Sequence, residues 1–382
     1  MVLPVSPNPI SVSQIATEIQ ILSAGLTLSH PRIKTIISDW TNPITMSSLH
    51  GKSWPLIHGS TYSFFNPVGA APVTVPAGAN FVSMKLWGGG GGGGACMTAG
   101  VASGGGGAGA FIWVVGACTP GETLTYQVGG GGGGGLTASG AGAGGGGASW
   151  VYNSTRGFYY LIAPGGGGGG TTGNQASDTG GHGGNGAYGD GLHGLNGGSI
   201  TSNPGTLGNS LFVEDGGFGG VNSTTPAHSG GNGTFLQGGL GGDGAYTTRP
   251  SNGGVGGGGA GGTGSLAGGV VGGGGGGGGA GYFGGGGGAH VSTSGGAGGG
   301  AGSYYGYANS QIFTVQIAFQ INNDAKAYGN TMPTYPAPNA QSVDLYGNYG
   351  TNFYGRGGAA RDTVGNGNAG SAGYINLQFF TL

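Results

Sequence analysis

The sequence predicts a mainly β protein: a β-sandwich with a long inserted bundle of polyglycine II helices and a short helical N-terminal leader. Two observations favour this fold class. Segments with apolar residues at every second position lie near both ends of the glycine-rich part of the chain. Glycine accounts for 107 of the 382 residues, and it forms long runs at 88–94, 129–135, 165–170, 272–279 and 284–288.

We interpret the glycine runs as packed structure, not as flexible linkers. Linkers mix Gly with Ser and other polar residues, whereas these runs are interrupted by Ala, Leu, Val, Phe and Tyr. The chain is 36% hydrophobic and 5% charged, the reverse of a disordered composition. Collagen is excluded because no strict G-X-Y period is present. A polyglycine II helix has three residues per turn and no internal hydrogen bonds, so its backbone groups must pair with neighbouring helices.

Residues 1–57 are predicted to form the helical leader. Ser11 and Gln14 have the spacing of a capping box, and a second short helix is expected to begin near Ser29. The segment is too small to bury a sizeable core. We therefore expect its apolar faces to dock on a partner protein, through Val12, Ile15, Ile19, Leu22, Ile33 and Ile36.

Residues 58–163 are predicted to form the β-sandwich with the first glycine runs. Residues 81–87 alternate as a strand, and residues 111–115 are an apolar strand that leads to the turn Pro120-Gly121. Beyond that turn, the apolar side chains of a further strand face one way, and a hairpin is expected around a loop at 153–157. These side chains are Leu124, Tyr126 and Val128.

Residues 164–303 are predicted as the polyglycine II region, and residues 304–382 as a strand, a Tyr-rich loop insertion and a closing strand. The two strands are expected at 311–321 and 374–379, where apolar residues alternate. A closing strand so far from the first one indicates that the chain returns to the same sandwich. The glycine-rich region is then one very long insertion.

Charge and cysteine content exclude several classes of protein. A net charge of -2 gives no basic surface for nucleic acid or anionic membrane. Two cysteines cannot form a disulfide framework, which leaves buried thiols or a single bridge. We find no signal peptide and no apolar stretch of about 20 residues that could span a bilayer. Synthesis in a cytoplasm is therefore expected.

No residue pattern indicates an enzyme, a metal site or a cofactor. The Gly51-Lys52-Ser53 segment lacks the first glycine of a P-loop, since position 46 is Met. Other polar residues have neither metal-ligand spacing nor the frame of a glycosidase carboxylate pair. These residues are Asp178, His182, Asp190, His193, Glu214, Asp215 and Asp243.

Aromatic residues in loop-like segments are the candidate binding residues. Tyr supplies a large contact area at low entropic cost, and loops on rigid scaffolds often carry binding residues. The favoured set lies in the Tyr-rich loop: Tyr328, Tyr335, Tyr346, Tyr349, Phe353 and Tyr354. The alternative set lies between glycine runs: Tyr188, Phe212, Phe235 and Tyr246. A purely structural role is also open, in which such rings cap the glycine bundle and fill the sandwich edges.

The strands and glycine runs occur in an order that resembles the glycine-rich domain of bacteriophage tail fibres. The resemblance is carried by VPAGANFVSMKLWGGGGGGG, by GGGGAGAFIWVVGACTPGETLTYQVGGGGGGG and by the terminal GSAGYINLQFF. The leader looks like that of many phage tail structural proteins. In composition, the central region resembles tail-tip adhesins built from polyglycine II helices, in which loops contact the bacterial receptor.

This resemblance implies a virion protein, made in the host cytoplasm, that recognises the host surface by non-catalytic, multivalent binding. Its implied partners are other tail or baseplate proteins, through residues 1–57, and a host surface glycan or outer-membrane protein. Several copies per virion are expected, and no nucleic-acid partner. The alternatives are a purely structural tail or baseplate connector, a tail depolymerase and an ice-binding glycine bundle. Irregular interruptions between the glycine runs disfavour the last.

Overall fold

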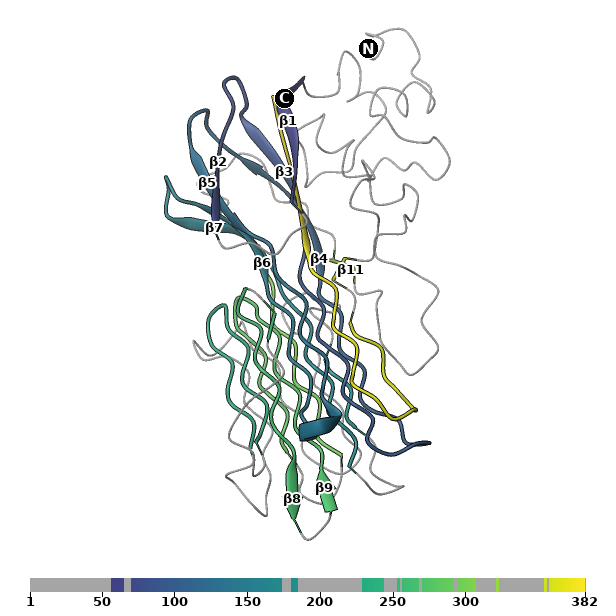
Figure 1. Cartoon of the computed structure of the whole chain (residues 1–382). Coiled ribbons are helices and arrows are strands. Elements are labelled where there is room, and N and C mark those ends of the chain that lie inside the picture. The colour runs from purple at the N-terminus through teal and green to yellow at the C-terminus, as the bar shows by residue number, and fades with distance from the viewer. Residues whose placement is uncertain are drawn as a thin grey trace, which may run out of the picture.

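The computed structural model describes residues 56–64, 70–173, 180–184, 229–243, 253–254, 256–267, 270–290, 295–306, 321–322, 354–355 and 357–381. These residues form mostly strands in antiparallel sheets, and helix within them is limited to the short 3-10 helix η2 (Thr137–Ser139). The prediction of a mainly β protein is confirmed. Figure 1 shows the labelled strands of both large sheets above a set of long, narrow chain segments that run down to β8 and β9.

The first sheet places the C-terminal strand beside the N-terminal ones. Its order is β1-β12-β3-β4-β11, with every neighbouring pair antiparallel. Here β12 lies between β1 and β3, with Leu377 opposite Met84, so the predicted return of the closing strand is confirmed. The strands are β1 (Leu56–Phe64), β3 (Phe81–Trp87), β4 (Phe111–Ala117), β11 (Ile321–Asn322) and β12 (Tyr374–Thr381).

The second sheet has the order β10-β7-β6-β5-β2 and is also antiparallel. Within this sheet, β6 and β7 form the predicted hairpin around residues 153–157. A separate two-stranded sheet, which the sequence analysis did not predict, pairs β8 (Ser265–Ala267) with β9 (Val270–Gly272). The strands of the second sheet are β2 (Ala71–Thr74), β5 (Thr123–Gln127), β6 (Ser149–Asn153), β7 (Phe158–Ala163) and β10 (Tyr305–Gly306).

One hydrophobic core contains residues of both five-stranded sheets. Fully burying such a side chain stabilises a fold by about 1.5–3 kcal/mol. The core includes Val82, Met84, Leu86, Ile112, Val114, Leu124, Tyr126, Val128, Val151, Leu161, Ile375, Leu377 and Phe379. The prediction that Leu124, Tyr126 and Val128 face one way is confirmed, because all three are buried in this core.

Strand β3, which was predicted from its alternating sequence, is buried on both faces. Of its residues, Ser83 alone is not buried. Its second face carries two aromatic clusters formed with the neighbouring strands β4 and β12, one of Trp87 with Phe111 and Tyr374, the other of Phe81 with Phe380.

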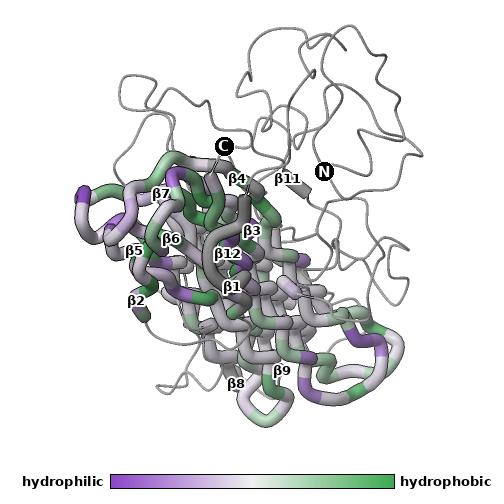
Figure 2. The backbone as a smooth tube through the Cα atoms, turned by 90° about the horizontal axis from the view of Figure 1, so that it is seen from above, coloured by the Kyte–Doolittle hydropathy of each residue, from purple (hydrophilic) through white to green (hydrophobic). Residues whose placement is uncertain are grey.

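Hydrogen bonds between the glycine segments repeat every third residue. Along residues 88–94, every third backbone N–H donates to a carbonyl of segment 104–110. The next set donates to segment 144–147, and the third set donates to segment 368–371, all at 2.7–2.9 Å. A single run is therefore bound to three neighbouring segments in turn. Figure 2 shows these segments as pale tubes close together beneath the labelled strands.

The same period recurs elsewhere, which makes it a property of the packing and not of one run. Within residues 142–147, successive N–H groups donate to segments 259–262, 166–169 and 130–133 in rotation. Residues 274–280 repeat the pattern with segments 140–146, 239–242 and 297–300. Every backbone donor in these stretches has a partner in another segment, as buried backbone requires.

Close approach of neighbouring backbones requires glycine in these runs. A Cβ added to any residue of Gly273–Gly279 would lie 1.9–2.3 Å from a carbonyl oxygen of a neighbouring segment. The backbone conformation does not demand glycine there, because none of the five long runs contains a residue with positive φ. A few buried alanines mark the places where a methyl group fits, such as Ala143, Ala280 and Ala297.

The predicted leader lies almost entirely outside the described residues. This holds for Val12, Ile15, Ile19, Leu22, Ile33 and Ile36. Of the strand predicted at 311–321, Ile321 alone is described, in β11. In the described part of the chain, no helix has the length and apolarity needed to cross a membrane.

Candidate binding surface

Tyr354 is the one member of the favoured aromatic set that the structure describes. Its ring is stacked on Tyr374 with centroids 4.5 Å apart, and it lies 6.5 Å from Trp87. Tyr354 therefore packs against the ends of β3 and β12, where it covers an internal aromatic cluster. Tyr328, Tyr335, Tyr346, Tyr349 and Phe353 lie outside the described residues.

Phe235, from the alternative set, is described and lies on the surface. Its side chain is 46% exposed. The ring contacts Tyr159 at a centroid distance of 5.7 Å and Tyr282 at 5.5 Å, both edge-to-face. The other members of this set, Tyr188, Phe212 and Tyr246, lie outside the described residues.

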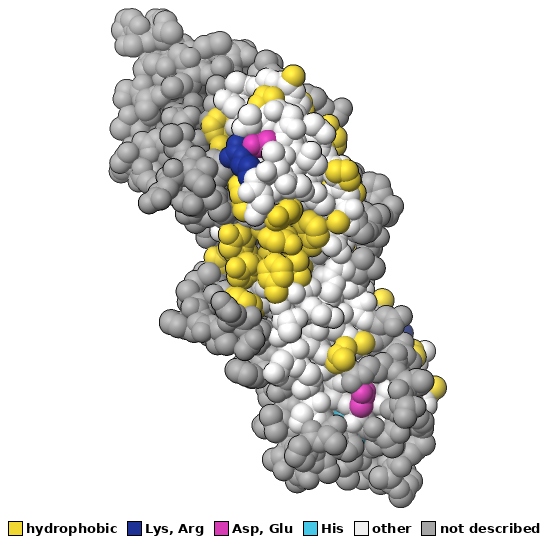
Figure 3. All heavy atoms as spheres, turned by 90° about the vertical axis from the view of Figure 1, so that its left-hand side faces the viewer, with side chains coloured by type: hydrophobic (Ala, Val, Ile, Leu, Met, Phe, Trp, Pro, Cys, Tyr) yellow, Lys and Arg dark blue, Asp and Glu magenta, His cyan; other side chains and the backbone are white. Residues whose placement is uncertain are grey.

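Phe235 belongs to a continuous series of five rings, which we call the aromatic strip. The strip consists of Tyr152, Tyr159, Phe235, Tyr282 and Tyr305. From one ring to the next, the centroids are 4.8, 5.7, 5.5 and 4.6 Å apart. The four tyrosines are partly buried. Figure 3 shows the face of the molecule that lies on the left-hand side in Figure 1, and hydrophobic side chains are gathered in its middle.

The strip lies where the second sheet meets the glycine segments. Tyr152 is on β6, Tyr159 on β7 and Tyr305 on β10, which are neighbours in the sheet. Tyr282 follows the run that ends at Gly279. Beneath the rings, a buried layer supports them through Ala148, Trp150, Ile162 and Ala280.

The turn that carries Phe235 is held by backbone hydrogen bonds on both sides. Within the turn, the N–H of Thr234 donates to the carbonyl of Gln237 at 2.7 Å. Outside it, the N–H of Leu236 donates to Gly281 at 2.9 Å, and the N–H of Gly284 donates to Thr234 at 2.9 Å. Leu236 has a φ of 56°, a left-handed conformation that is unusual for a branched side chain. This fixed geometry places the exposed ring against Tyr282.

The hydroxyl of Tyr159 is neutral at physiological pH. Burial, and secondly the neighbouring Tyr152, raise the pKa of Tyr159 above its usual value of 10. A neutral phenol both donates and accepts hydrogen bonds. The strip therefore offers flat apolar faces with uncharged polar tips.

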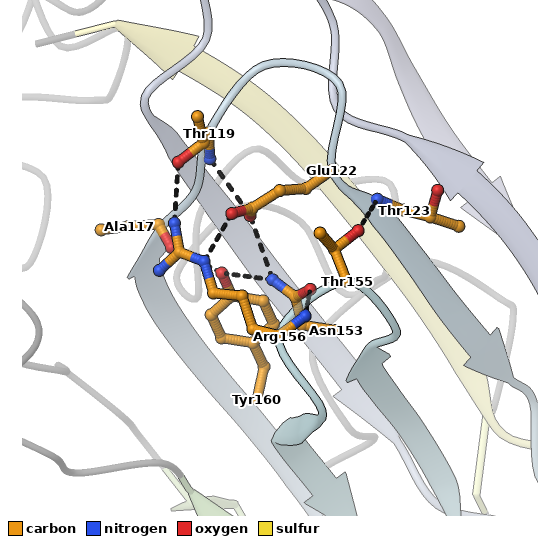
Figure 4. Close-up of polar contacts among 8 residues, drawn as sticks. All are labelled: Ala117, Thr119, Glu122, Thr123, Asn153, Thr155, Arg156 and Tyr160. Carbon is orange, nitrogen blue, oxygen red and sulfur yellow. Dashed lines mark hydrogen bonds and ion pairs between the residues drawn. The ribbon is translucent and has the colours of Figure 1, made fainter.

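A second candidate is the polar cluster at Glu122 and Arg156, which joins two turns of the sheets (Figure 4). Glu122 accepts hydrogen bonds from the N–H of Thr119 at 3.2 Å and from the Asn153 amide at 3.0 Å, and it pairs with Nε of Arg156. Arg156 also donates to the Thr119 hydroxyl at 2.7 Å. Both charged groups are thus occupied by neighbours, and the cluster fixes the turns at 119–122 and 153–157.

The polar cluster has too few carboxyl and metal-binding side chains for glycoside hydrolysis or for a metal site. Hydrolysis of a glycosidic bond needs two carboxyl groups, and Glu122 is the single carboxylate of this network. Among the described residues, no group of three His, Cys, Asp or Glu side chains could hold a metal ion. Of the polar residues weighed above as metal or acid candidates, His182 and Asp243 are described, and neither lies in such a group.

Both cysteines are free thiols, which decides the alternative left open by the sequence. Cys96 and Cys118 are buried and unbridged. Cys96 lies in a loop that adjoins the glycine segments, where its thiol donates to the carbonyls of Thr98 and Val101 at 3.1 and 3.2 Å.

Sequence reasoning missed most of the aromatic strip. Tyr152 and Tyr159 lie in a correctly predicted hairpin, but their strands alone gave no reason to expect partly exposed rings that continue into a strip. Tyr282 and Phe283 lie between two long glycine runs, and this pair of bulky residues was the sequence signal that could have indicated the strip. Comparison with known proteins assigns no family: no protein-family model matches the chain, and no curated protein matches it.

Proposed function

We propose that this chain is a bacteriophage tail-fibre or tail-tip adhesin that recognises the bacterial surface by binding, without catalysis. The observation that carries the proposal is the aromatic strip on a scaffold of closely packed glycine segments. A rigid support keeps the rings in place before a ligand arrives, which reduces the entropic cost of binding. The order of strands and glycine runs, which resembles phage tail fibres, supports the same function.

The finer architecture is part of this proposal. The two five-stranded sheets form a β-sandwich, supported by the core that they share. The glycine segments form a polyglycine II bundle, supported by the three-residue repeat of their hydrogen bonds, because that helix has three residues per turn. The bundle is an insertion between the early strands and β12.

Attachment and copy number complete the proposal. Residues 1–57 bind other tail or baseplate proteins through their apolar helical faces, and the protein is carried on the virion. Several copies per particle then bind the host surface together. Once one copy is bound, the other copies bind at a high effective concentration, so weak individual contacts give strong adhesion. No cofactor, metal or nucleic acid takes part.

Binding of the purified full-length protein to a panel of bacterial strains tests this function. We expect Phe235→Ala to weaken binding to a recognised strain roughly tenfold, the loss of about 1.4 kcal/mol that a hot-spot aromatic supplies. Val364→Ala is the matched control, because Val364 is 60% exposed and lies outside the strip. Thermal melting confirms that both variants are folded.

Two results would contradict the adhesin. Equal binding by Phe235→Ala, Val364→Ala and the unaltered protein would remove the strip from the function. Binding to no strain, together with virions that fail to assemble when the gene is deleted, would favour the tail or baseplate connector.

A further inference from the structure

We propose that the ligand of the aromatic strip is a neutral carbohydrate chain whose sugar rings stack on the strip. This inference rests on the proposed function, since it names the ligand class of the same surface.

The faces of the rings match one side of a sugar. An aromatic face carries negative quadrupole potential. The C–H groups on one side of a pyranose are apolar and weakly positive, so they pack on that face. Tyr282 and Tyr305 are stacked on each other, and Phe235 is edge-to-face with both Tyr159 and Tyr282, so an extended chain that follows the series meets ring faces and ring edges in turn.

Polar groups at the edge of the strip match the sugar hydroxyls. Four of the five rings are tyrosines, whose O–H groups donate and accept hydrogen bonds. Thr234 and Gln237, on either side of the Phe235 turn, are exposed and uncharged. The exposed side chains of Thr234 and Gln237 can each exchange a hydrogen bond with water for one with a sugar hydroxyl at little cost.

The charges favour a neutral ligand over an anionic one. Three Lys or Arg residues lie in the described segments, and each is buried or bonded to another residue. Lys85 is buried, Arg156 pairs with Glu122, and Arg361 donates to Asn368. A phosphate-bearing or acidic polymer would lack a cation from the described residues at the strip, whereas a neutral polysaccharide needs none.

The area of the strip is small for a protein partner. An aromatic side chain buries about 150–250 Å² when fully covered, and Phe235 is 46% exposed while the four tyrosines are partly buried, so the five rings offer on the order of 300 Å². A stable protein–protein interface needs about 800 Å² on each partner. Sugar recognition by stacking requires far less, because several weak sites on one particle act together.

The test uses full-length protein, a strain to which it binds, and neutral polysaccharide extracted from that strain. We expect the soluble polysaccharide to compete with cell binding, and the competition to be insensitive to salt because no charges are paired. Phe235→Ala and Tyr282→Ala should each weaken polysaccharide binding about tenfold, while Val364→Ala should leave it unchanged. Mild periodate oxidation of the cells should abolish binding, and protease treatment should not.

The outcomes separate this inference from the proposed function. If strip variants lose cell binding, but protease abolishes binding and periodate does not, the strip binds a protein and the carbohydrate inference is overturned. Competition by acidic polysaccharide alone, weakening with salt, would overturn it as well. If strip variants bind cells like the unaltered protein, the proposed role of the strip fails too.

Discussion

The hydroxyl of Ser149 donates a hydrogen bond of 2.6 Å to the backbone carbonyl of Trp87. Trp87 is the last residue of β3, and Ser149 is the first residue of β6, so the bond joins the two large sheets where each continues into glycine segments. The same hydroxyl oxygen accepts from the N–H of Gly129 at 2.9 Å. One fully buried side chain therefore satisfies backbone groups from two other segments.

Replacing Ser149 by Ala is expected to destabilise the protein by about 1–3 kcal/mol, because the Gly129 N–H loses its acceptor in a place that water does not reach. Thermal or denaturant unfolding measures the change. Thr125→Ala is the control, since the Thr125 hydroxyl bonds to Ser154 at an exposed site. Its effect should stay within about 0.5 kcal/mol. Equal losses in both variants would contradict the bridging role of Ser149.

Gly278→Ala tests whether the glycine runs are packed. The added Cβ would lie 1.9 Å from the carbonyl oxygen of Gly285, and both groups belong to backbone that cannot swing aside. Overpacking of this kind typically costs about 1–3 kcal/mol, and Gly278→Val should cost more. Gly306→Ala is the control, because nothing lies within 4 Å of its added Cβ. A melting temperature that Gly278→Ala leaves unchanged would indicate a flexible linker.

Local sequence patterns predicted β3, β4, β5, β6, β7 and β12 but could not predict which glycine segments meet. The alternation in residues 374–379 was sufficient to place a closing strand, and the turn at 153–157 was sufficient to place a hairpin. The partners of a glycine run leave no such trace, because Gly90 and Gly91 are chemically identical yet bond to Ser371 and Gly107. Apart from Phe235, the aromatic strip was missed for the same reason: its rings come from four segments that only the fold brings together.

Cys118 is expected to be unreactive while the protein is folded. Burial, and secondly the Glu122 carboxylate, raise the pKa of its thiol to about 12. Since the thiolate is the reactive form, alkylation near pH 8 should be slower than for an ordinary cysteine by a factor on the order of a thousand. Iodoacetamide labelling followed by mass spectrometry measures the rate. Denaturant should restore ordinary reactivity, and rapid labelling of the folded protein would contradict the burial of Cys118.

Acidification is expected to destabilise the glycine segments through His182. Its Nδ1 accepts a hydrogen bond of 3.0 Å from the N–H of Gly105, which requires a neutral ring with the proton on Nε2. Protonation would turn this acceptor into a donor that faces another donor. Burial lowers the pKa of His182 below its usual value of 6.5 in agreement with this arrangement.

The sign of the effect follows from proton binding. Because the folded pKa is lower than the unfolded one, the unfolded chain binds more protons between the two values. The stability from His182 is therefore complete above about pH 6.5 and is lost as the pH falls through the folded pKa. Unfolding by denaturant at a series of pH values measures this loss. His182→Asn should flatten it, because an amide oxygen accepts the same hydrogen bond and does not titrate in this range. At neutral pH we expect the two proteins to differ by no more than about 1 kcal/mol. An equally steep loss in His182→Asn would assign the pH dependence to other groups.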